Sequence, residues 1–246
     1  MTNAPHTIRA ARLAAGLLLP LLSGCMIAQP LGLPQIQGSG VAKTETRTVA
    51  DFTDLEVSSA VHVELAVGAA TTVVVTADDN ILPHVVTEVA SGKLKIHIDA
   101  PTASKLGVKV QATTPALNAF QGSGATTTKL AGVQADHFKL GLSGASTCTL
   151  TGKAKRLDLT IAGASRCTLT GDADRLTLDC SGASRVNAAD FDARAVQATV
   201  SGASSAEVNA TQELTAQAAG ASTRRYSGSP AQVKRQASGA ATIAPQ

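Results

Sequence analysis

Aromatic residues are the scarcest class in this 246-residue sequence, which contains four Phe, one Tyr and no Trp. Sugar-binding clefts and single-stranded nucleic-acid sites commonly use aromatic rings as stacking platforms, so this shortage argues against both. An excess of one charge is also missing, with 21 Lys and Arg against 18 Asp and Glu. Because nucleic-acid binders normally carry a clustered basic excess, we expect no nucleic-acid partner.

Enzyme and cofactor motifs are absent as well. The sequence contains no G-x-S-x-G nucleophile motif, no G-x-x-x-x-G-K phosphate loop and no G-x-G-x-x-G dinucleotide fingerprint. Its five histidines lack the spacing that would bring three or four ligands together around zinc. We therefore predict a protein that is not an enzyme and that needs no cofactor.

The N-terminus has the pattern of a bacterial lipoprotein signal. Arg9 and Arg12 precede an apolar run that is too short to span a bilayer and that ends in Leu22-Ser23-Gly24-Cys25. This ending resembles a lipobox, whose cysteine is acylated after cleavage, and Met26 replaces the Asp of an inner-membrane retention signal. We expect a signal peptide over 1–24, acylated Cys25 with a tether over 25–38, and an outer-membrane anchor. An ordinary cleaved signal is the alternative.

A repeat of about nineteen residues organises the rest of the chain. Tetrads similar to Ser-Gly-Ala-Ser recur with glycine spacings of 20, 19, 19, 20, 18 and 19 residues. Glycine at such corners supplies a positive φ or allows stacked turns to approach closely. The expected corner glycines are Gly124, Gly144, Gly163, Gly182, Gly202, Gly220 and Gly239.

Apolar and polar residues alternate on both sides of each corner, which predicts two strands per repeat with one buried face. Identical residue types recur at fixed offsets from one repeat to the next, so equivalent strands should stack in register and parallel. The predicted fold is therefore an all-β parallel β-helix with two sheets and about 19 residues per coil. Arg224 and Arg235 break apolar columns, which indicates either a bulge or pairing with an acid such as Glu213.

The N-terminal half of the body has a weaker version of this pattern. Residues 61–65, 71–75, 93–98 and 108–111 alternate like strands, and the stretch around Ser59 resembles a decayed corner. Residues 78–89 form an irregular insertion, with a helical turn that Asp79 or Asn80 would cap. We divide the body into a degenerate β-helical half over 39–115 and a regular repeat over 116–246.

The chain resembles the bacterial head-GIN-domain family of adhesin lipoproteins. The resemblance rests on residues 46–52, on the segment Ala77-Asp78-Asp79-Asn80-Ile81-Leu82 and on the run of Ser-Gly-Ala-Ser corners, and it extends over about residues 38–243. It implies a right-handed parallel β-helix of two sheets, no known catalytic residues and a role in cell-surface adhesion.

An acidic cluster is expected at the second corner of two neighbouring coils, where stacking would bring four carboxylates close together. The residues are Asp172, Asp174, Asp190 and Asp192. Such a cluster is compatible with a Ca²⁺ site, with the acid pair of a carbohydrate-cleaving enzyme, or with a solvated corner balanced by Arg156, Arg175 and Arg194. We favour the solvated corner.

Cys148 and Cys167 share a column in neighbouring coils, and Cys180 points inward from the other sheet. The oxidising envelope and the spacing of stacked strands would permit a Cys148–Cys167 disulfide. Neighbours directly in register rarely have suitable Cβ geometry, so we favour three buried free thiols.

These patterns predict a lipid-anchored protein of the bacterial cell envelope that displays a repetitive polar surface for adhesion to an unknown polymer or protein. Its membrane contact would be the lipid anchor, and the oligomeric state stays open. The alternatives are a carbohydrate-active β-helix enzyme that uses the acidic cluster, and an envelope scaffold or signalling lipoprotein.

Overall fold

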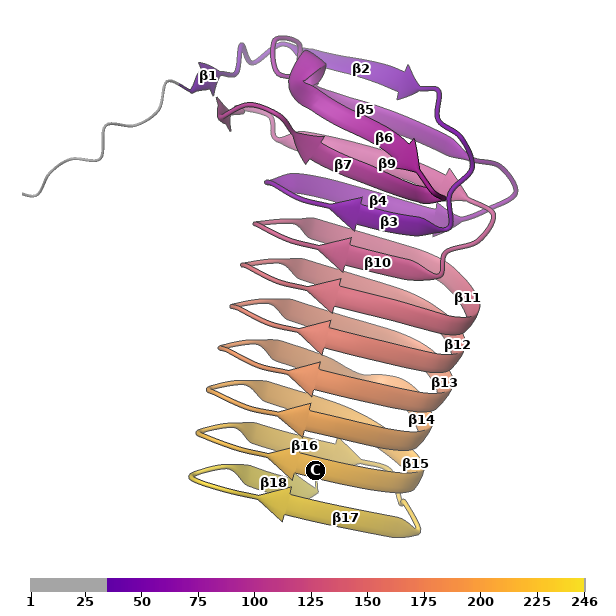
Figure 1. Ribbon diagram of the computed structural model, residues 1–246, viewed down its shortest axis with the longest axis vertical. Coiled ribbons are helices and arrows are strands. Elements are labelled where there is room, and N and C mark those ends of the chain that lie inside the picture. Colours follow the sequence, from indigo (N-terminus) through magenta and orange to yellow (C-terminus); the bar gives the residue numbers. More distant parts are fainter. Residues whose placement is uncertain (1–34, 246) are drawn as a thin grey trace, which may run out of the picture. The chain divides into compact units, whose positions relative to one another are not determined.

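The computed structural model describes residues 35–245, which form a parallel β-solenoid (Figure 1). This confirms the predicted all-β fold with coils of about nineteen residues. Within this range the only helical element is a 3-10 turn, η1 (Leu82–His84), and no helix is long and apolar enough to cross a membrane. The strands are β1 Ile36–Gln37, β2 Ala42–Arg47, β3 Asp54–Val57, β4 Val61–Val67, β5 Thr72–Asp78, β6 Val85–Ala90, β7 Lys93–Ile98, β8 Thr102–Ala103, β9 Val108–Thr114, β10 Ala119–Gly122, β11 Thr127–Leu142, β12 Thr147–Ile161, β13 Arg166–Cys180, β14 Arg185–Val200, β15 Ser205–Ala218, β16 Thr223–Ser227, β17 Gln232–Ala237 and β18 Thr242–Pro245.

Five long strands, β11 to β15, build the regular part of the stack. Each strand runs along one face, bends at the second corner and returns along the opposite face, and its neighbours pair with it in parallel. The two faces therefore belong to one continuous sheet of sixteen strands, where the sequence indicated two sheets. Between β12 and β13 the coils stay in register through the second corner, as at Gly152 and Gly171, whereas the other three pairs of long strands shift register there.

The Ser-Gly-Ala-Ser corners interrupt the strands because their glycines adopt positive φ. All seven predicted corner glycines do so, with φ between 72° and 80°. At Gly163 a Cβ would lie 2.4 Å from the carbonyl oxygen of Gly144 in the coil above, so both conformation and close approach require glycine. Ser59, with φ 71°, forms the same corner between β3 and β4.

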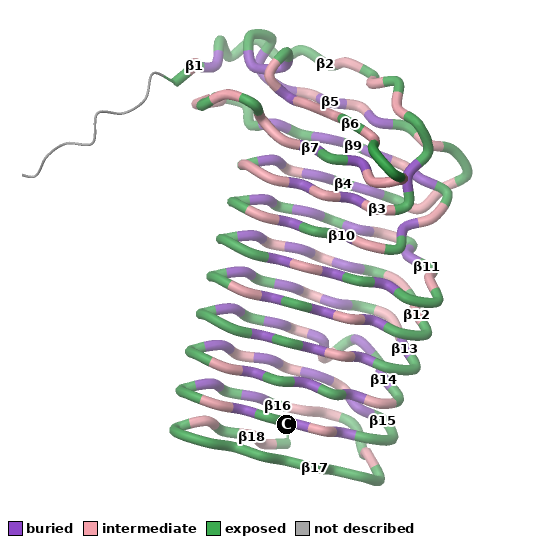
Figure 2. Tube along the Cα trace, viewed as in Figure 1, coloured by how far each residue is buried: buried purple, intermediate pink, exposed green. Residues whose placement is uncertain are grey.

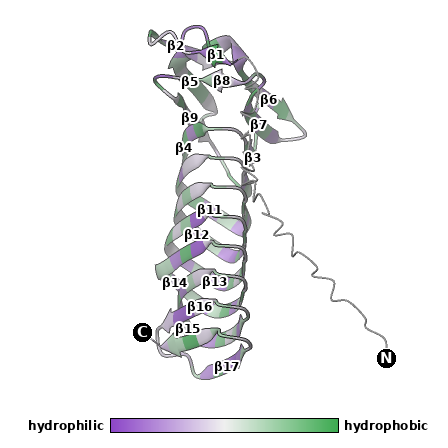
Figure 3. Cartoon of the chain, turned by 90° about the vertical axis from the view of Figure 1, so that its left-hand side faces the viewer, coloured by the Kyte–Doolittle hydropathy of each residue, from purple (hydrophilic) through white to green (hydrophobic). Residues whose placement is uncertain are grey.

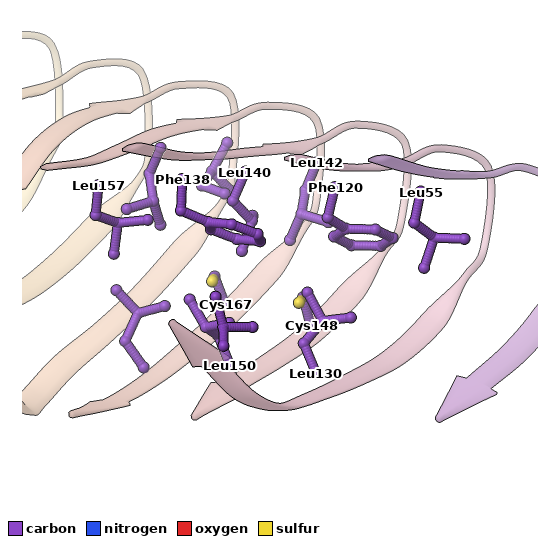
Figure 4. Close-up of a cluster of buried hydrophobic side chains, with 14 of the residues drawn as sticks. Leu55, Phe120, Leu130, Phe138, Leu140, Leu142, Cys148, Leu150, Leu157 and Cys167 are labelled. Atoms are coloured by element: carbon purple, nitrogen blue, oxygen red, sulfur yellow. The ribbon is translucent and has the colours of Figure 1, made fainter. Parts of the chain in front are cut away.

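Alternation along the strands fills a thin core between the faces. Buried and exposed residues alternate along every long strand (Figure 2), and leucines and phenylalanines of one face point toward leucines and cysteines of the other (Figure 4). Toward the C-terminus the inward residues become smaller, as Leu140, Leu159 and Leu178 give way to Ala198 and Ala216. The buried core ends before the last coil, since every residue of β17 is exposed.

The first coils stack in a different order from their order in the sequence. Strands β3 and β4 lie between β7 and β9 on one side and β10 and β11 on the other. The β3–β4 coil thus comes first in the sequence, the β7–β9 coil stacks on its outer side, and β10 and β11 stack on its inner side. Antiparallel pairs β2–β5, β5–β9 and β6–β7 close this end above the stacked coils (Figure 3).

Asp78 joins two loops of this N-terminal end. Its buried carboxylate accepts hydrogen bonds from the backbone N–H of Gly40, Lys105 and Leu106 and from the hydroxyl of Ser104. These donors, with the Ser104 hydroxyl as the largest contribution, lower the pKa of Asp78. A carboxylate surrounded by N–H donors stabilises a loop junction and leaves no coordination position for a cation.

The neighbours of Asp78 do not cap the helical turn, which corrects the expectation from the sequence. The residue before η1 is Ile81, and no side chain caps the turn. Asp79 instead accepts a hydrogen bond from Ser39, and Asn80 bonds the backbone of Gln37 and Ser39. Both side chains hold the loop before β2, because its backbone polar groups have no strand partner there.

Candidate functional site

The two outward faces of the solenoid are its most extensive polar surfaces. We call one the 139 face, after the column that includes Lys139, Asp158 and Thr177. The opposite one is the 166 face, after the column that includes Thr147, Arg166, Arg185 and Ser205. Each column adds one side chain per coil, at the strand spacing of about 4.8 Å.

A shallow hollow of about 660 Å³ lies on the 139 face over β3 and β10 to β12. It forms because Ala119 and Gly141 occupy outward positions and leave the backbone uncovered. Its polar lining includes Asp158, Lys139 and the Lys93–Glu56 ion pair, whose N–O distance is 3.3 Å.

Asp158 is the most heavily bonded carboxylate of this face. It accepts hydrogen bonds from His137 Nε2 at 2.7 Å and from Arg156 Nε at 2.9 Å. Partial burial alone would raise its pKa, but the bonds from Arg156, His137 and Thr177 outweigh that effect and lower it. The group is therefore held as a carboxylate, which suits recognition of a polar ligand better than proton transfer at neutral pH.

The predicted acidic cluster is distributed along the second corner, where most of its members have partners. Asp172 accepts from Lys153 Nζ at 2.8 Å, Asp174 contacts Arg194 at 3.4 Å, and Asp192 accepts from Asn209 at 2.6 Å. The hydrogen bond from Lys153 to Asp172 raises the pKa of that lysine. Asp190 is exposed beside the register shift of β14.

Among residues 35–245 no three His, Cys, Asp or Glu side chains are grouped so that they could hold a metal ion. Of the three expected arginines, Arg194 does contact the acidic corner, through Asp174, whereas Arg156 contacts Asp158. Asp172 and Asp192 are Cα partners on neighbouring coils, so two of the four carboxylates do lie side by side, and each has a cationic or amide partner on the coil beyond.

The cysteines form a thiol cluster in the core. Cys148 and Cys167 pair in register, and both are buried and free, as is Cys180. The sulfur atoms of Cys148 and Cys167 point toward the opposite face (Figure 4). A hydrogen bond with Cys167, together with burial, raises the pKa of the Cys148 thiol, so this group is unreactive as a nucleophile.

The position of Arg224 matches neither alternative that the sequence left open, a bulge or pairing with an acid. It pairs in register in β16, without a bulge, and its fully buried side chain extends into the core. Nη1 donates to the carbonyl oxygen of Ala198 at 2.6 Å, and none of the ion pairs among residues 35–245 includes this guanidinium. The alanines of the neighbouring coils provide the space that it fills. Arg235, by contrast, is exposed in the last coil.

Sequence reasoning did not single out the paired arginines of the two faces. Arg166 stands beside Arg185 in register, and Arg156 stands beside Arg175. Aligning the repeats on their corner glycines would have found both pairs, because each pair shares one offset. Cys25 and the signal peptide lie outside the described residues.

Comparisons with known proteins agree with this architecture. A family model described as "Putative auto-transporter adhesin, head GIN domain" matches residues 51–230. A solved structure of a putative adhesin from Bacteroides fragilis has a TM-score of 0.77 at 22% identity and covers 86% of this chain and 100% of its own. One from Parabacteroides merdae has a TM-score of 0.74 at 18% identity, covering 86% and 99%.

A structure described as a putative lipid binding protein from Parabacteroides distasonis has a TM-score of 0.69 at 19% identity, covering 87% of this chain and 100% of its own. At these identities the structural likeness shows the shared fold alone. No curated protein matches the chain.

Proposed function

The chain belongs to the head GIN domain family, and from this membership we propose that it is a non-enzymatic adhesin of the bacterial cell envelope, anchored through acylated Cys25. The family and several structural neighbours carry the adhesin name. The lipobox-like ending Leu22-Ser23-Gly24-Cys25 supports the anchor, because two or more acyl chains give stable membrane attachment.

The observation that carries the proposal is the long outward 166 face with its repeated polar columns. On the 166 face Thr149, Thr168 and Asn187 succeed one another in register. Such a surface offers many similar weak hydrogen bonds to an extended partner. Binding would then gain its strength from multivalency, since each further contact along a tethered partner is effectively intramolecular.

The enzyme alternative has less support from the geometry. A carbohydrate-cleaving site needs one carboxyl group that is protonated and one that is free. Asp172 and Asp174 contact cations, and Asp192 accepts from an amide. The envelope-scaffold alternative makes a different prediction, namely one stoichiometric protein partner in the periplasm.

The anchor is tested by expressing the full chain and Cys25→Ala with a labelled fatty acid. We expect label and membrane fractionation for the wild type and neither for the variant. Cys180→Ala is the matched control, because it removes a buried thiol and leaves the lipobox intact. Equal labelling of the wild type and Cys25→Ala would contradict the anchor.

The adhesin role is tested on cells that express the full chain. We expect the solenoid to be digested by protease added to intact cells, and we expect such cells to adhere to a polymer-coated surface more than cells with an empty vector. Complete protection from external protease, together with recovery of one stoichiometric envelope protein by pull-down, would favour the scaffold alternative and overturn adhesion.

A further inference from the structure

The 166 face carries an unneutralised pair of arginines at its centre. Arg166 and Arg185 are Cα partners on β13 and β14, and both are exposed. The two side chains start about 4.8 Å apart, the spacing of neighbouring strands. Like charges directly opposite each other on a sheet destabilise it, so the pair has an unfavourable interaction that a bound anion would relieve.

Within the described part of the chain, no carboxylate forms an ion pair with either arginine. None of the ion pairs among residues 35–245 includes Arg166 or Arg185. The only side-chain hydrogen bond found there joins Arg185 Nε to the hydroxyl of Ser205 at 3.3 Å. Guanidinium groups with free N–H donors are well suited to bind carboxylate, sulfate or phosphate groups through two parallel hydrogen bonds.

The surroundings of the pair are hydroxyl and amide groups. Thr147 precedes Arg166 in the same column, and Thr149, Thr168 and Asn187 form the next column. Over β11 to β16 the outward charges of this face are four cations and one acid, namely Lys129, Arg166, Arg185, Arg225 and Glu207. The 139 face is close to neutral over β11 to β17, with Lys139, Arg156, Arg175 and Lys234 against Asp158, Asp179 and Glu213.

We propose that the 166 face binds an acidic polysaccharide, with Arg166 and Arg185 holding its anionic groups and the neighbouring Thr and Asn side chains bonding its hydroxyls. This inference rests on the proposed adhesin role and names its ligand class. An extended polymer fits because the face is long and presents cationic and hydroxyl side chains on successive coils at the strand spacing.

Other anionic partners fit the face less well. The exposed large apolar residues, Val41, Leu106 and Val233, lie away from the arginine pair, so this surface has nothing to insert into a membrane. Nucleic acid normally needs a larger clustered basic excess than this chain carries.

The chain provides a matched control on its other face. Arg156 and Arg175 are also exposed Cα partners, but Arg156 Nε donates to Asp158 at 2.9 Å. The double variants R166Q/R185Q and R156Q/R175Q therefore remove the same charge from exposed, in-register pairs on opposite faces. All four side chains are exposed, so we expect both variants to fold, as circular dichroism would verify.

Binding of the detergent-solubilised full chain is measured against immobilised polygalacturonate, with dextran, duplex DNA and anionic vesicles as comparison probes. We expect binding to polygalacturonate that weakens with added salt, and none to dextran. R166Q/R185Q should bind about tenfold more weakly or worse, and R156Q/R175Q should change affinity by less than about threefold.

Equal losses in the two variants would mean that net charge alone decides binding, and would overturn the site. Tighter binding to DNA or vesicles than to polygalacturonate would overturn the ligand class. If the wild type binds no polygalacturonate while its cells still adhere, this inference fails and the adhesin role stands. If the purified chain binds in the expected pattern while cells do not adhere, the adhesin role fails and the site stands.

Discussion

Arg224 provides the sharpest test of the energetic reasoning. Its side chain is fully buried in the core, Nη1 donates to Ala198, and Nε and Nη2 have no hydrogen-bond partner. Burial lowers the pKa of Arg224 from its usual value to about 10. Since one pKa unit corresponds to about 1.4 kcal/mol, the charged form in the core costs about 3 kcal/mol relative to water.

Replacing this arginine with methionine should therefore stabilise the protein. Arg224→Met keeps an unbranched chain that fills most of the same space and removes the unpaired charge. We expect the free energy of unfolding to rise by about 1–3 kcal/mol, because replacing buried ionic groups with apolar ones has gains of this order. The melting temperature should rise by roughly 2–4 °C per kcal/mol.

Urea unfolding followed by far-ultraviolet circular dichroism measures the change. Amide hydrogen exchange in β16 to β18 reports it locally, because the last coils can open before the rest. Arg225→Met is the matched control, since Arg225 is the next residue of the strand and is exposed; its effect should stay within about 0.5 kcal/mol. A loss of stability in Arg224→Met with no change in Arg225→Met would refute the reasoning, because the guanidinium would then be making net favourable interactions.

Four further outcomes follow from the same structure. Gly163→Ala should lower stability by about 2 kcal/mol or more in urea unfolding, because it places a Cβ against the Gly144 carbonyl at positive φ. Gly141→Ala should be nearly neutral, because its Cβ would meet only the Gln121 side chain, at an ordinary contact distance of 3.7 Å. Asp78→Asn should lower the melting temperature at pH 7 and make the melting temperature less dependent on acid pH. The reason is that the lowered pKa of Asp78 contributes stability that is present above about pH 3.9 and is lost as the pH falls through the folded pKa. A wild-type curve that is equally flat would argue against this junction. Millimolar Ca²⁺ should leave the melting temperature unchanged, and a clear upward shift would restore the metal hypothesis for the acidic corner. Thiol titration of the denatured, unreduced acylated protein should find three free thiols, and a count of one would reveal the disulfide.

The repeating half of the fold could be predicted because its information is local. Leu150 and Leu169, for example, sit at the same offset from their corner glycines, and that offset alone places them inward and in register. Positive φ at Gly163 could be anticipated as well, since few other residues adopt it without strain. Period-two alternation then fixes which face of each strand is buried.

The N-terminal end was less predictable because pairing there depends on distant segments. The alternation of β5 marks it as a strand but does not show that its partners are β2 and β9, both antiparallel to it. The partners of a strand depend on which strand edges lie beside it in the folded protein, and the order of residues in the sequence does not show which edges these are. The role of Asp78 was hidden for the same reason, since its four partners come from loops far apart in the chain.

The sequence by itself determined the scarcity of aromatic rings, the nineteen-residue period and the inward columns, because each depends only on residue type and spacing. The tertiary structure alone decided the stacking order of the first coils, the burial of Arg224 among alanines from other coils, and the contrast between the two arginine pairs. The reason in each case is that the free energy of a side chain depends on what lies one coil away. Arg156 has a carboxylate within reach, Arg166 has none, and the residues near either arginine in the chain do not reveal this difference.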